Sequence, residues 1–354
     1  MHVGLLTGGG DCPGLNAVIR ACTLALIHES GARVTGIERG FYGLLEKRAR
    51  PLDAHAVAGI LAEGGTVLGT HNKCDPFHDG GAGGADRSAE AMEFVRSLGL
   101  DAMVVIGGDG TMSIAHRFMP LGLPMVGVPK TIDNDLWGTD RTFGFDSAVA
   151  VVSEALDRLG TTARSHGRVM IVETMGRYAG WIALEGGIAG GADVILLPEV
   201  PFTVEAVAER CRQREAEGAA TLICIAEGAA PVGGHLTVQK RIADSPDPLR
   251  LGGVGHWLQE ALQPKVQSEV RTTLLGHLQR GGSPTAFDRV LATRFGAHAA
   301  QLVKRGRFGE MVALQGDEIT SVPITEVAGK TRNVPADHGL LQLLRSIGVS
   351  LGDG

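Results

Sequence analysis

Residues 3–37 read VGLLTGGGDCPGLNAVIRACTLALIHESGARVTGI. The stretch begins with the apolar run Val3–Thr7, which is typical of a buried strand. A glycine-rich turn and the helical pattern Leu15–His28 follow, and the apolar run Arg33–Ile37 ends the stretch. Strand, helix and strand in this order predict two parallel strands whose connecting helix covers one face of a sheet.

The same alternation continues along the chain. Further apolar runs predict strands at Met103–Ile106, Met125–Val128, Arg168–Val172, Val194–Leu197, Thr221–Ala226, Arg271–Leu275 and Met311–Leu314. Helical patterns predict helices at Ala85–Ser97, Thr111–Phe118, Ser147–Leu159, Val204–Glu217 and Phe287–Lys304. We therefore predict an α/β protein with parallel sheets that helices cover on both faces. Residues 228–252 are the least regular, and Gly80–Gly84 is expected to be a mobile surface loop.

The composition limits the classes of function. The chain has 354 residues, which at about 150 residues per domain predicts two domains. Hydrophobic residues make up 44% and charged residues 20%, as in globular proteins. The net charge of −6 and the aromatic content of 4% argue against a nucleic-acid partner. An anionic ligand must therefore be held by local arginines, lysines or backbone N–H groups.

The sequence also indicates a compartment. No apolar run reaches about 18 residues, so we expect no transmembrane helix and no membrane partner. The first residues are typical of a strand and lack the basic region of a signal peptide. The five cysteines include no C-x-x-C motif, which favours free thiols in a reducing compartment. We expect a cytoplasmic protein.

The glycine-rich turn of the opening stretch is a candidate phosphate site. It reads Gly8-Gly9-Gly10-Asp11-Cys12-Pro13-Gly14, and glycines between a strand and a helix let backbone N–H groups approach a phosphate. Pro13 breaks a G-x-G-x-x-G fingerprint, and no G-K-[ST] follows, which argues against Rossmann and Walker sites. A tight turn that binds nothing is the alternative.

A second glycine-rich turn follows the strand Met103–Ile106. It reads Gly107-Gly108-Asp109-Gly110-Thr111. The glycines open an approach for a phosphate, and the Asp109 carboxylate is a hard ligand that suits Mg²⁺. The alternative is a turn in which Asp109 caps the following helix.

A dense polar loop follows the next predicted strand. It reads Pro129-Lys130-Thr131-Ile132-Asp133-Asn134-Asp135. One carboxylate of this loop can act as a general base that takes a proton from a sugar hydroxyl, and the second can support Mg²⁺. The alternative is an Asx-rich turn with solvated acids.

Basic side chains gather at the later strands and their ends. They are Arg168, Arg177, Arg271, His277 and Arg280. Arginines can bind a phosphate bidentately, so together these residues favour a sugar-phosphate site on a net-acidic protein. Taken singly, each arginine is more often a partner in a surface ion pair.

The stretch between His71 and Asp79 holds several possible metal ligands. Its spacing matches no zinc site. We expect instead a loop that faces a nucleotide, with Lys73 on a phosphate.

Several motifs in one order carry a resemblance to a known family. They are Gly-Gly-Asp-x-Pro-Gly-x-Asn, Gly-Gly-Asp-Gly-Thr, Lys-Thr-Ile-Asp-Asn-Asp, Met-Gly-Arg and Gly-His-x-Gln-Arg-Gly-Gly. From Met1 to about Ala328 the chain resembles the 6-phosphofructokinases. Lys130 makes it most similar to the branch that mixes ATP-using and pyrophosphate-using members.

The resemblance implies a fold, a reaction and an assembly. The fold is two doubly wound α/β domains of the phosphofructokinase type, with the active site in the cleft between them. Residues 1–143 plus 277–327 would bind the phosphoryl donor, and residues 144–276 plus 328–354 would bind fructose 6-phosphate. The glycolytic reaction would transfer the terminal phosphoryl of MgATP to the sugar's 1-hydroxyl. A homodimer or homotetramer is implied, because Arg168 and Arg271 match arginines that complete a neighbour's site.

The resemblance also assigns roles to single residues. Asp133 matches the general base, Asp135 and Arg177 match further catalytic residues, and Asp109 matches the ligand of the Mg²⁺ cofactor. Donor contacts match Gly10, Lys73, Gly108, Asp109, Gly110, Thr111 and Lys130. Sugar-phosphate contacts match Thr131, Asp133, Arg168, Met175, Gly176, Arg177, Glu227, Arg271, His277 and Arg280.

Two sets of matched positions bear on the donor and on regulation. Gly110 leaves room for a nucleotide's α-phosphate where pyrophosphate users usually carry Asp, whereas Lys130 is shared with those users. An added lysine excludes neither donor, so the choice depends on Gly110. Because Gly110 leaves room for a nucleotide, we predict ATP. At the family's effector site Arg20 remains, but the positions of its partners hold no cation. These positions are Leu24, Ala54, Gly160, Ala219 and Ala220.

Other functions stay open at this point. The first is a pyrophosphate-dependent fructose 6-phosphate 1-phosphotransferase. A nicotinamide-dependent oxidoreductase is disfavoured by Pro13, and a non-catalytic sugar-phosphate sensor is disfavoured by the intact acids Asp109, Asp133 and Asp135. An NAD or lipid kinase would use Gly-Gly-Asp-Gly-Thr but leaves the arginine and histidine set unexplained.

Overall fold

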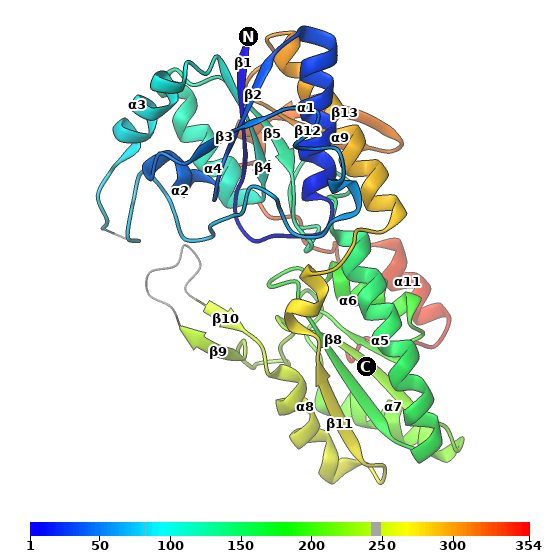
Figure 1. Cartoon of the computed structure of the whole chain (residues 1–354). Coiled ribbons are helices and arrows are strands. Elements are labelled where there is room, and N and C mark those ends of the chain that lie inside the picture. The colour runs from blue at the N-terminus through cyan, green and yellow to red at the C-terminus, as the bar shows by residue number, and fades with distance from the viewer. Residues whose placement is uncertain (82, 242–248) are drawn as a thin grey trace.

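The computed structural model describes residues 1–81, 83–241 and 249–354, which form two regions, each built on its own sheet (Figure 1). The larger sheet has the strand order β13-β12-β5-β4-β1-β2-β3. Its strands are β1 (His2–Thr7), β2 (Arg33–Ile37), β3 (Ala49–Leu52), β4 (Ala102–Gly107), β5 (Met125–Pro129), β12 (Glu310–Gln315) and β13 (Glu318–Pro323).

The smaller sheet has the order β11-β6-β8-β7 and is parallel throughout. Its strands are β6 (Val169–Thr174), β7 (Val194–Leu196), β8 (Thr221–Ala226) and β11 (Val270–Leu274). A separate antiparallel pair joins β9 (Val238–Arg241) to β10 (Leu249–Leu251). Every strand predicted from an apolar run is present, with its ends shifted by at most two residues.

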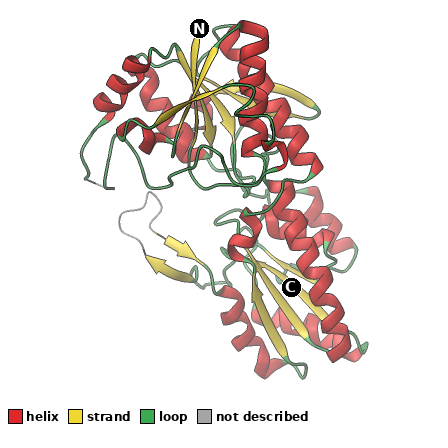
Figure 2. Ribbon diagram, viewed as in Figure 1, coloured by secondary structure: helices red, strands yellow, loops and turns green. Residues whose placement is uncertain are grey.

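Helices lie on both faces of the sheets (Figure 2). The described residues form α1 (Leu15–Ser30), α2 (Phe41–Leu45), α3 (Ser88–Leu98), α4 (Asp109–Phe118), α5 (Phe145–His166), α6 (Trp181–Ala189), α7 (Val204–Ala216), α8 (Val254–Leu262), α9 (Ala286–Lys304), α10 (Ile324–Val327) and α11 (Gly339–Ser346). Short 3₁₀ turns are η1 (Ile60–Ala62), η2 (Met119–Leu121), η3 (Gln263–Lys265) and η4 (Gly276–Arg280). Within the described residues, no helix combines the length and the apolar character that a membrane crossing requires.

The core of the larger region lies on both faces of its sheet. Helices α1 and α9 pack together on one face, and α2, α3 and α4 cover the other (Figure 1). Gly296 permits the close approach of α9 to α1, because a Cβ there would lie 2.6 Å from the carbonyl oxygen of Val18. The strands β1, β4 and β5 are buried along nearly their whole length, which explains their uninterrupted apolar sequences.

The expectation of wholly parallel sheets is wrong at two edges of the larger sheet. Strand β3 runs antiparallel to β2, and β13 runs antiparallel to β12. The two-residue turn Gly316-Asp317 joins β12 to β13, and such a turn forces neighbouring strands to run in opposite directions. Edge strands are half exposed, so they lack the apolar runs that reveal the inner strands.

Two stretches singled out in the sequence fall partly outside the described residues. They contain residue 82, in the loop Gly80–Gly84, and residues 242–248, in the stretch 228–252. The described parts of the second stretch hold β9 and β10, which were not predicted. Helices α6 and α8 were also missed; α6 is apolar on all sides and therefore shows no helical period.

The strand order places the carboxyl ends of β1 and β4 side by side. The chain goes from β1 to β2 on one side and later to β4 on the other, and such a switch in direction opens a crevice beyond the strand ends. Both glycine-rich turns begin at this point. The chain then crosses to the smaller sheet after β5, returns after β11, and crosses again after α10.

Candidate active site

The first glycine-rich turn is held by hydrogen bonds from three other segments. Thr70 Oγ1 donates to the carbonyl oxygen of Gly9 at 2.5 Å. Lys130 Nζ donates to the carbonyl oxygen of Gly10, and Arg280 Nη1 donates to that of Asp11 at 3.2 Å. The turn that follows β1 therefore meets two cations that the sequence placed in separate motifs.

The second glycine-rich turn packs against the first through Thr111. A Cβ at Gly107 would lie 2.2 Å from Thr111 Oγ1, and one at Gly8 would lie 2.5 Å from the same atom. Both glycines are therefore needed to seat the buried threonine side chain. This packing role of Thr111 was not predicted. By contrast, a Cβ at Gly110 would meet no atom within 4 Å, so this position faces open space.

Asp109 begins α4 and is half buried. Its Oδ1 accepts a hydrogen bond from the backbone N–H of Gly329 at 2.7 Å and one from Ser113 Oγ at 3.5 Å. The predicted metal ligand thus lies against a segment near the C-terminal end of the chain. That neighbour was not expected from the sequence.

The loop after β5 contains buried charges. Lys130 is 4% exposed, and its burial lowers its pKa. Asp133 is 5% exposed, and its Oδ1 is buried without a hydrogen-bond partner among the described residues. Burial, together with the neighbouring Asp133 carboxylate, raises the pKa of Asp135. An unpaired buried carboxylate oxygen is free to accept a proton from a substrate.

The predicted sugar-phosphate residues after β6 form a tight turn. Arg177 has a left-handed backbone with φ of 51°, and its N–H donates to Glu227 Oε1 at 3.0 Å. Burial raises the pKa of Glu227 to about 7, and the Asp133 carboxylate contributes to this rise. Asp133 extends from the larger sheet and Glu227 from the smaller one, so charged groups of both regions act on each other here.

Two supporting residues were missed by sequence reasoning. Gln279 is fully buried in η4, and its Oε1 accepts the N–H of Met175 at 3.3 Å. Gly228 admits the turn itself, because a Cβ there would lie 1.9 Å from the carbonyl oxygen of Arg177. Their positions within the motif Gly-His-x-Gln-Arg and directly after Glu227 were the available signals. His277 shares η4 with Gln279 and is exposed.

Arg168 and Arg271 lie apart from the other predicted residues. They stand at the amino ends of β6 and β11, whereas Met175–Arg177 follow the carboxyl end of β6. Both arginines pair with Glu269, Arg168 Nε at 2.6 Å from its Oε2. Within one chain, these two arginines are therefore not part of the cluster that contains Asp133.

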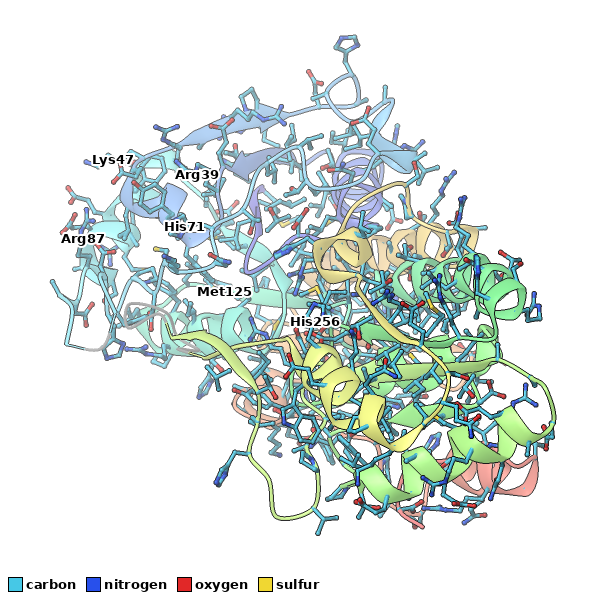
Figure 3. All side chains as sticks on the ribbon, turned by 90° about the horizontal axis from the view of Figure 1, so that it is seen from below. Arg39, Lys47, His71, Arg87, Met125 and His256 are labelled. Atoms are coloured by element: carbon cyan, nitrogen blue, oxygen red, sulfur yellow. The ribbon has the colours of Figure 1, made fainter. Side chains whose placement is uncertain are left out.

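The loop that contains Lys73 continues from Thr70 and is partly exposed. The backbone N–H of Lys73 donates to His71 Nδ1 at 3.4 Å, and the His71 ring stacks on Tyr42 with centroids 4.8 Å apart. Figure 3 shows His71 and Arg39 in the same part of the larger region. Asp75 accepts from Arg117 at 3.0 Å, so the acids of this loop bind other side chains.

Comparisons with known proteins identify the family of the chain. A sequence profile described as Phosphofructokinase matches residues 2–303. The chain belongs to the phosphofructokinase family. It is 50% identical to an ATP-dependent 6-phosphofructokinase of Chloroflexus aggregans, over 99% of this chain and 98% of that protein. It is 49% identical to a pyrophosphate–fructose 6-phosphate 1-phosphotransferase of Streptomyces coelicolor, over 99% of this chain and 100% of that protein.

The fold is also found among solved structures. The phosphofructokinase of Pichia pastoris, solved in the T-state, superposes with a TM-score of 0.80 at 32% identity. The match covers 92% of this chain and 37% of that much longer chain. The predicted α/β fold of the phosphofructokinase type is confirmed.

Proposed function

We propose that this protein transfers the terminal phosphoryl of MgATP to the 1-hydroxyl of D-fructose 6-phosphate, giving fructose 1,6-bisphosphate and ADP. The observation that carries the proposal is the buried Asp133 carboxylate, whose Oδ1 has no hydrogen-bond partner among the described residues and whose charge acts on Glu227 beside the Arg177 turn. Relatives that are 50% identical to this chain over 99% of its length are named as ATP-dependent 6-phosphofructokinases, which supports the same reaction.

The two regions would divide the binding between them. Residues 1–143 and 277–327 would bind the donor, and residues 144–276 and 328–354 would bind the sugar. Donor contacts would come from Gly10, Lys73, Gly108, Asp109, Gly110, Thr111 and Lys130. Sugar-phosphate contacts would come from Thr131, Met175, Gly176, Arg177, Glu227, His277 and Arg280.

Mg²⁺ suits the residues present. Asp109 is a half-buried carboxylate beside glycines that admit phosphates, and Mg²⁺ commonly takes one or two carboxylates plus phosphate oxygens. In the described ranges, no group of three or more His, Cys, Asp and Glu side chains could hold a metal by itself. Asp109, supported by Asp135, would hold the ion, which would neutralise charge on the donor's phosphate oxygens.

The chain's own residues would mainly position the reactants. Asp133 would accept the proton of the 1-hydroxyl while that oxygen attacks the terminal phosphorus. Arg177 would stabilise the charge that develops on the transferred phosphoryl. Glu227 would orient the sugar while holding the Arg177 turn through its N–H. Holding both substrates in line would account for much of the rate.

The donor depends on Gly110 and Lys130. Open space at Gly110 supports ATP, because nothing there repels an α-phosphate. Pyrophosphate-dependent transfer is the second candidate, favoured by Lys130 and by the name of the Streptomyces coelicolor relative. Lys130 donates to the Gly10 carbonyl, a contact compatible with either donor. We therefore favour ATP.

The test is an assay of fructose 6-phosphate and Mg²⁺ with ATP and with pyrophosphate in parallel. We expect a higher kcat/KM with ATP. A higher value with pyrophosphate would reverse the choice of donor, and no fructose 1,6-bisphosphate with either donor would refute the proposed function.

The variant Gly110→Asp sharpens this test. Its carboxylate would enter open space and repel an α-phosphate, so ATP use should fall far more than any pyrophosphate use. Gly339→Asp is the matched control, because Gly339 also lies in the first turn of a helix and also faces open space. The control should leave both activities unchanged.

The assembly and the compartment belong to the same proposal. We expect a homo-oligomer in which Arg168 and Arg271 complete a neighbour's site.

All five cysteines lie in the described ranges, and they are buried thiols without disulfides. Free thiols are usual in a reducing compartment, which supports the cytoplasm as the location.

A further inference from the structure

Residues 329–334 form a connecting segment between α10 and α11 that contacts three parts of the candidate site. At its start, Gly329 N–H donates to Asp109. In its middle, Thr331 bridges to Leu136 in the loop after β5. At its end, Val334 N–H donates to Glu199 Oε1 at 2.9 Å, in the smaller region. One short segment therefore joins the predicted metal ligand, the loop of the predicted base and the smaller region.

Arg332 makes the central contacts of this segment. Its backbone N–H donates to the carbonyl oxygen of Asp135 at 2.7 Å, and its Nη1 donates to that of Asn134 at 3.1 Å. Its own carbonyl oxygen accepts from Trp181 Nε1 at 2.9 Å, and its guanidinium lies 4.2 Å from the centre of the Trp181 ring. Arg332 thus links the loop that contains Asp133 to the start of α6.

The loop depends on such support because Asn134 has an uncommon backbone conformation. Asn134 has a left-handed backbone with φ of 51°, a conformation that asparagine adopts more readily than most residues other than glycine but that still needs local contacts to maintain it. Its Oδ1 accepts the N–H of Thr142 at 3.0 Å, and its carbonyl oxygen accepts the Arg332 guanidinium. Asn134 lies directly between Asp133 and Asp135, so its backbone determines where both carboxylates point.

We infer that Arg332 is a positioning residue for the proposed phosphoryl transfer: it holds Asn134 in its left-handed conformation and thereby aims the Asp133 carboxylate. The inference rests on the proposed function, because it needs Asp133 as the base. Arg332 acts on the backbone of the loop, so its loss should slow the chemical step more than it weakens substrate binding. A displacement of about 1 Å at a reacting group can lower a rate by roughly 10²-fold.

The experiment compares Arg332→Met, Arg332→Lys and the matched control Arg141→Met. Methionine keeps an apolar stem against Trp181 but removes the donor to Asn134, whereas lysine keeps one cationic donor. Arg141 is a suitable control because it also lies over aromatic rings, those of Phe145 and Phe287, and pairs with Glu185 at 2.8 Å. No hydrogen bond joins Arg141 to the backbone of residues 133–135 in the described structure.

We expect Arg332→Met to lower kcat by roughly 10–100-fold while both KM values change by less than about threefold. Arg332→Lys should recover part of the loss, and Arg141→Met should leave kcat unchanged. An equal fall of kcat in Arg332→Met and Arg141→Met, or a rise of KM without a fall of kcat, would overturn the inference. If Arg332→Met does not fold, Arg332→Gln takes its place, because the shorter amide does not reach the Asn134 carbonyl oxygen: a kcat equal to that of the unmodified enzyme would overturn the inference, and a fall of kcat without a rise of KM would support it. Failure of the proposed function is separate, since the unmodified enzyme would then form no product.

Discussion

At the scale of single residues, the candidate site depends on backbone conformations that few residues adopt. Asn134 and Arg177 both have φ of 51°, and each lies next to a residue with a proposed role in chemistry. A left-handed conformation costs most non-glycine residues about 1–2 kcal/mol, and asparagine less. Hydrogen bonds from Thr142 and to Glu227 maintain the two turns. Strain of this kind is expected where a site is held ready for its substrate.

Asp133→Asn tests the proposed base. We expect kcat to fall by roughly 10²–10⁴-fold, because an amide cannot accept the proton in the transition state. KM should change much less, since the proton moves only during the chemical step. Steady-state kinetics with varied fructose 6-phosphate measure both constants. Asp140→Asn, at an exposed acid nearby, should retain the unmodified activity, and an unchanged kcat in Asp133→Asn would remove the residue from this role.

Glu227→Gln tests whether the buried Glu227 carboxyl lowers the stability of the folded protein while it contributes to fructose 6-phosphate binding. Burial raises the pKa of Glu227 from 4.5 to about 7, so folding favours the protonated acid. The folded state therefore loses stability as pH rises from about 4.5 to 7, and the loss is complete above this range.

Glutamine removes this pH-dependent loss. The stability of Glu227→Gln relative to the unmodified protein should therefore rise by about 2–3 kcal/mol from pH 5 to pH 8. It should also weaken fructose 6-phosphate binding. Thermal unfolding at both pH values is the measurement, with the exposed Glu318→Gln as control. A gain that is the same at pH 5 and pH 8 would contradict the titration of Glu227.

At the scale of elements, the helices that would carry an effector site keep only one of its matched cations, Arg20. Arg20 and Leu24 lie on α1, and Gly160 lies on α5. Ala219 and Ala220 precede β8. Arg214 donates to the carbonyl oxygen of Ala220 at 3.4 Å, but it pairs with Asp193 at 3.1 Å and with Glu217 at 3.0 Å. Arg214 is thus already paired with carboxylates, which leaves Arg20, whose buried Nε has no hydrogen-bond partner among the described residues, as the one matched cation for a phosphorylated effector.

We therefore expect weak or absent regulation by ADP and phosphoenolpyruvate. A phosphate dianion binds tightly only where several cations converge, and four of the matched positions other than Leu24 are alanine or glycine. Initial rates against fructose 6-phosphate should stay hyperbolic and unshifted when either compound is added. Sigmoidal curves with strong inhibition by phosphoenolpyruvate would contradict this prediction.

At the scale of the whole molecule, two of the predicted sugar-phosphate residues lie outside the candidate site of their own chain. Arg168 and Arg271 share Glu269 at the end of the smaller sheet opposite to the Arg177 turn. Both side chains are partly accessible, at 30% and 53%. A phosphate from a neighbouring subunit's site would compete with Glu269 for these arginines. The position of the pair therefore suits a contribution to another subunit better than one to its own.

Mixing two inactive variants tests this assembly. Arg168→Ala and Asp133→Asn should each be nearly inactive, but refolding them together should restore part of the activity. A hybrid oligomer contains sites in which one chain supplies a native Asp133 and its neighbour a native Arg168. Differently tagged copies show whether hybrids form. Hybrids without any regained activity would mean that each chain builds its own site.

Local sequence patterns determined the inner strands, the two glycine-rich turns and the acids Asp109 and Asp133. Buried strands need continuous apolar runs, and close backbone approaches need glycine, so each leaves a signal within a few residues. The half-exposed edge strands β3 and β13 left no such signal, and α6 lacked a period because nearly all of its residues are apolar or glycine.

Only the tertiary structure decided which distant residues support the site. Arg332 reaches Asn134 across 198 positions, and Gln279 reaches Met175 across 104. Such pairs depend on how two sheets and their connections pack, and a single arginine or glutamine in the sequence looks like any surface residue. The separation of Arg168 and Arg271 from Asp133 was decided in the same way, because both ends of a parallel strand carry polar residues and only the fold assigns them to different sites.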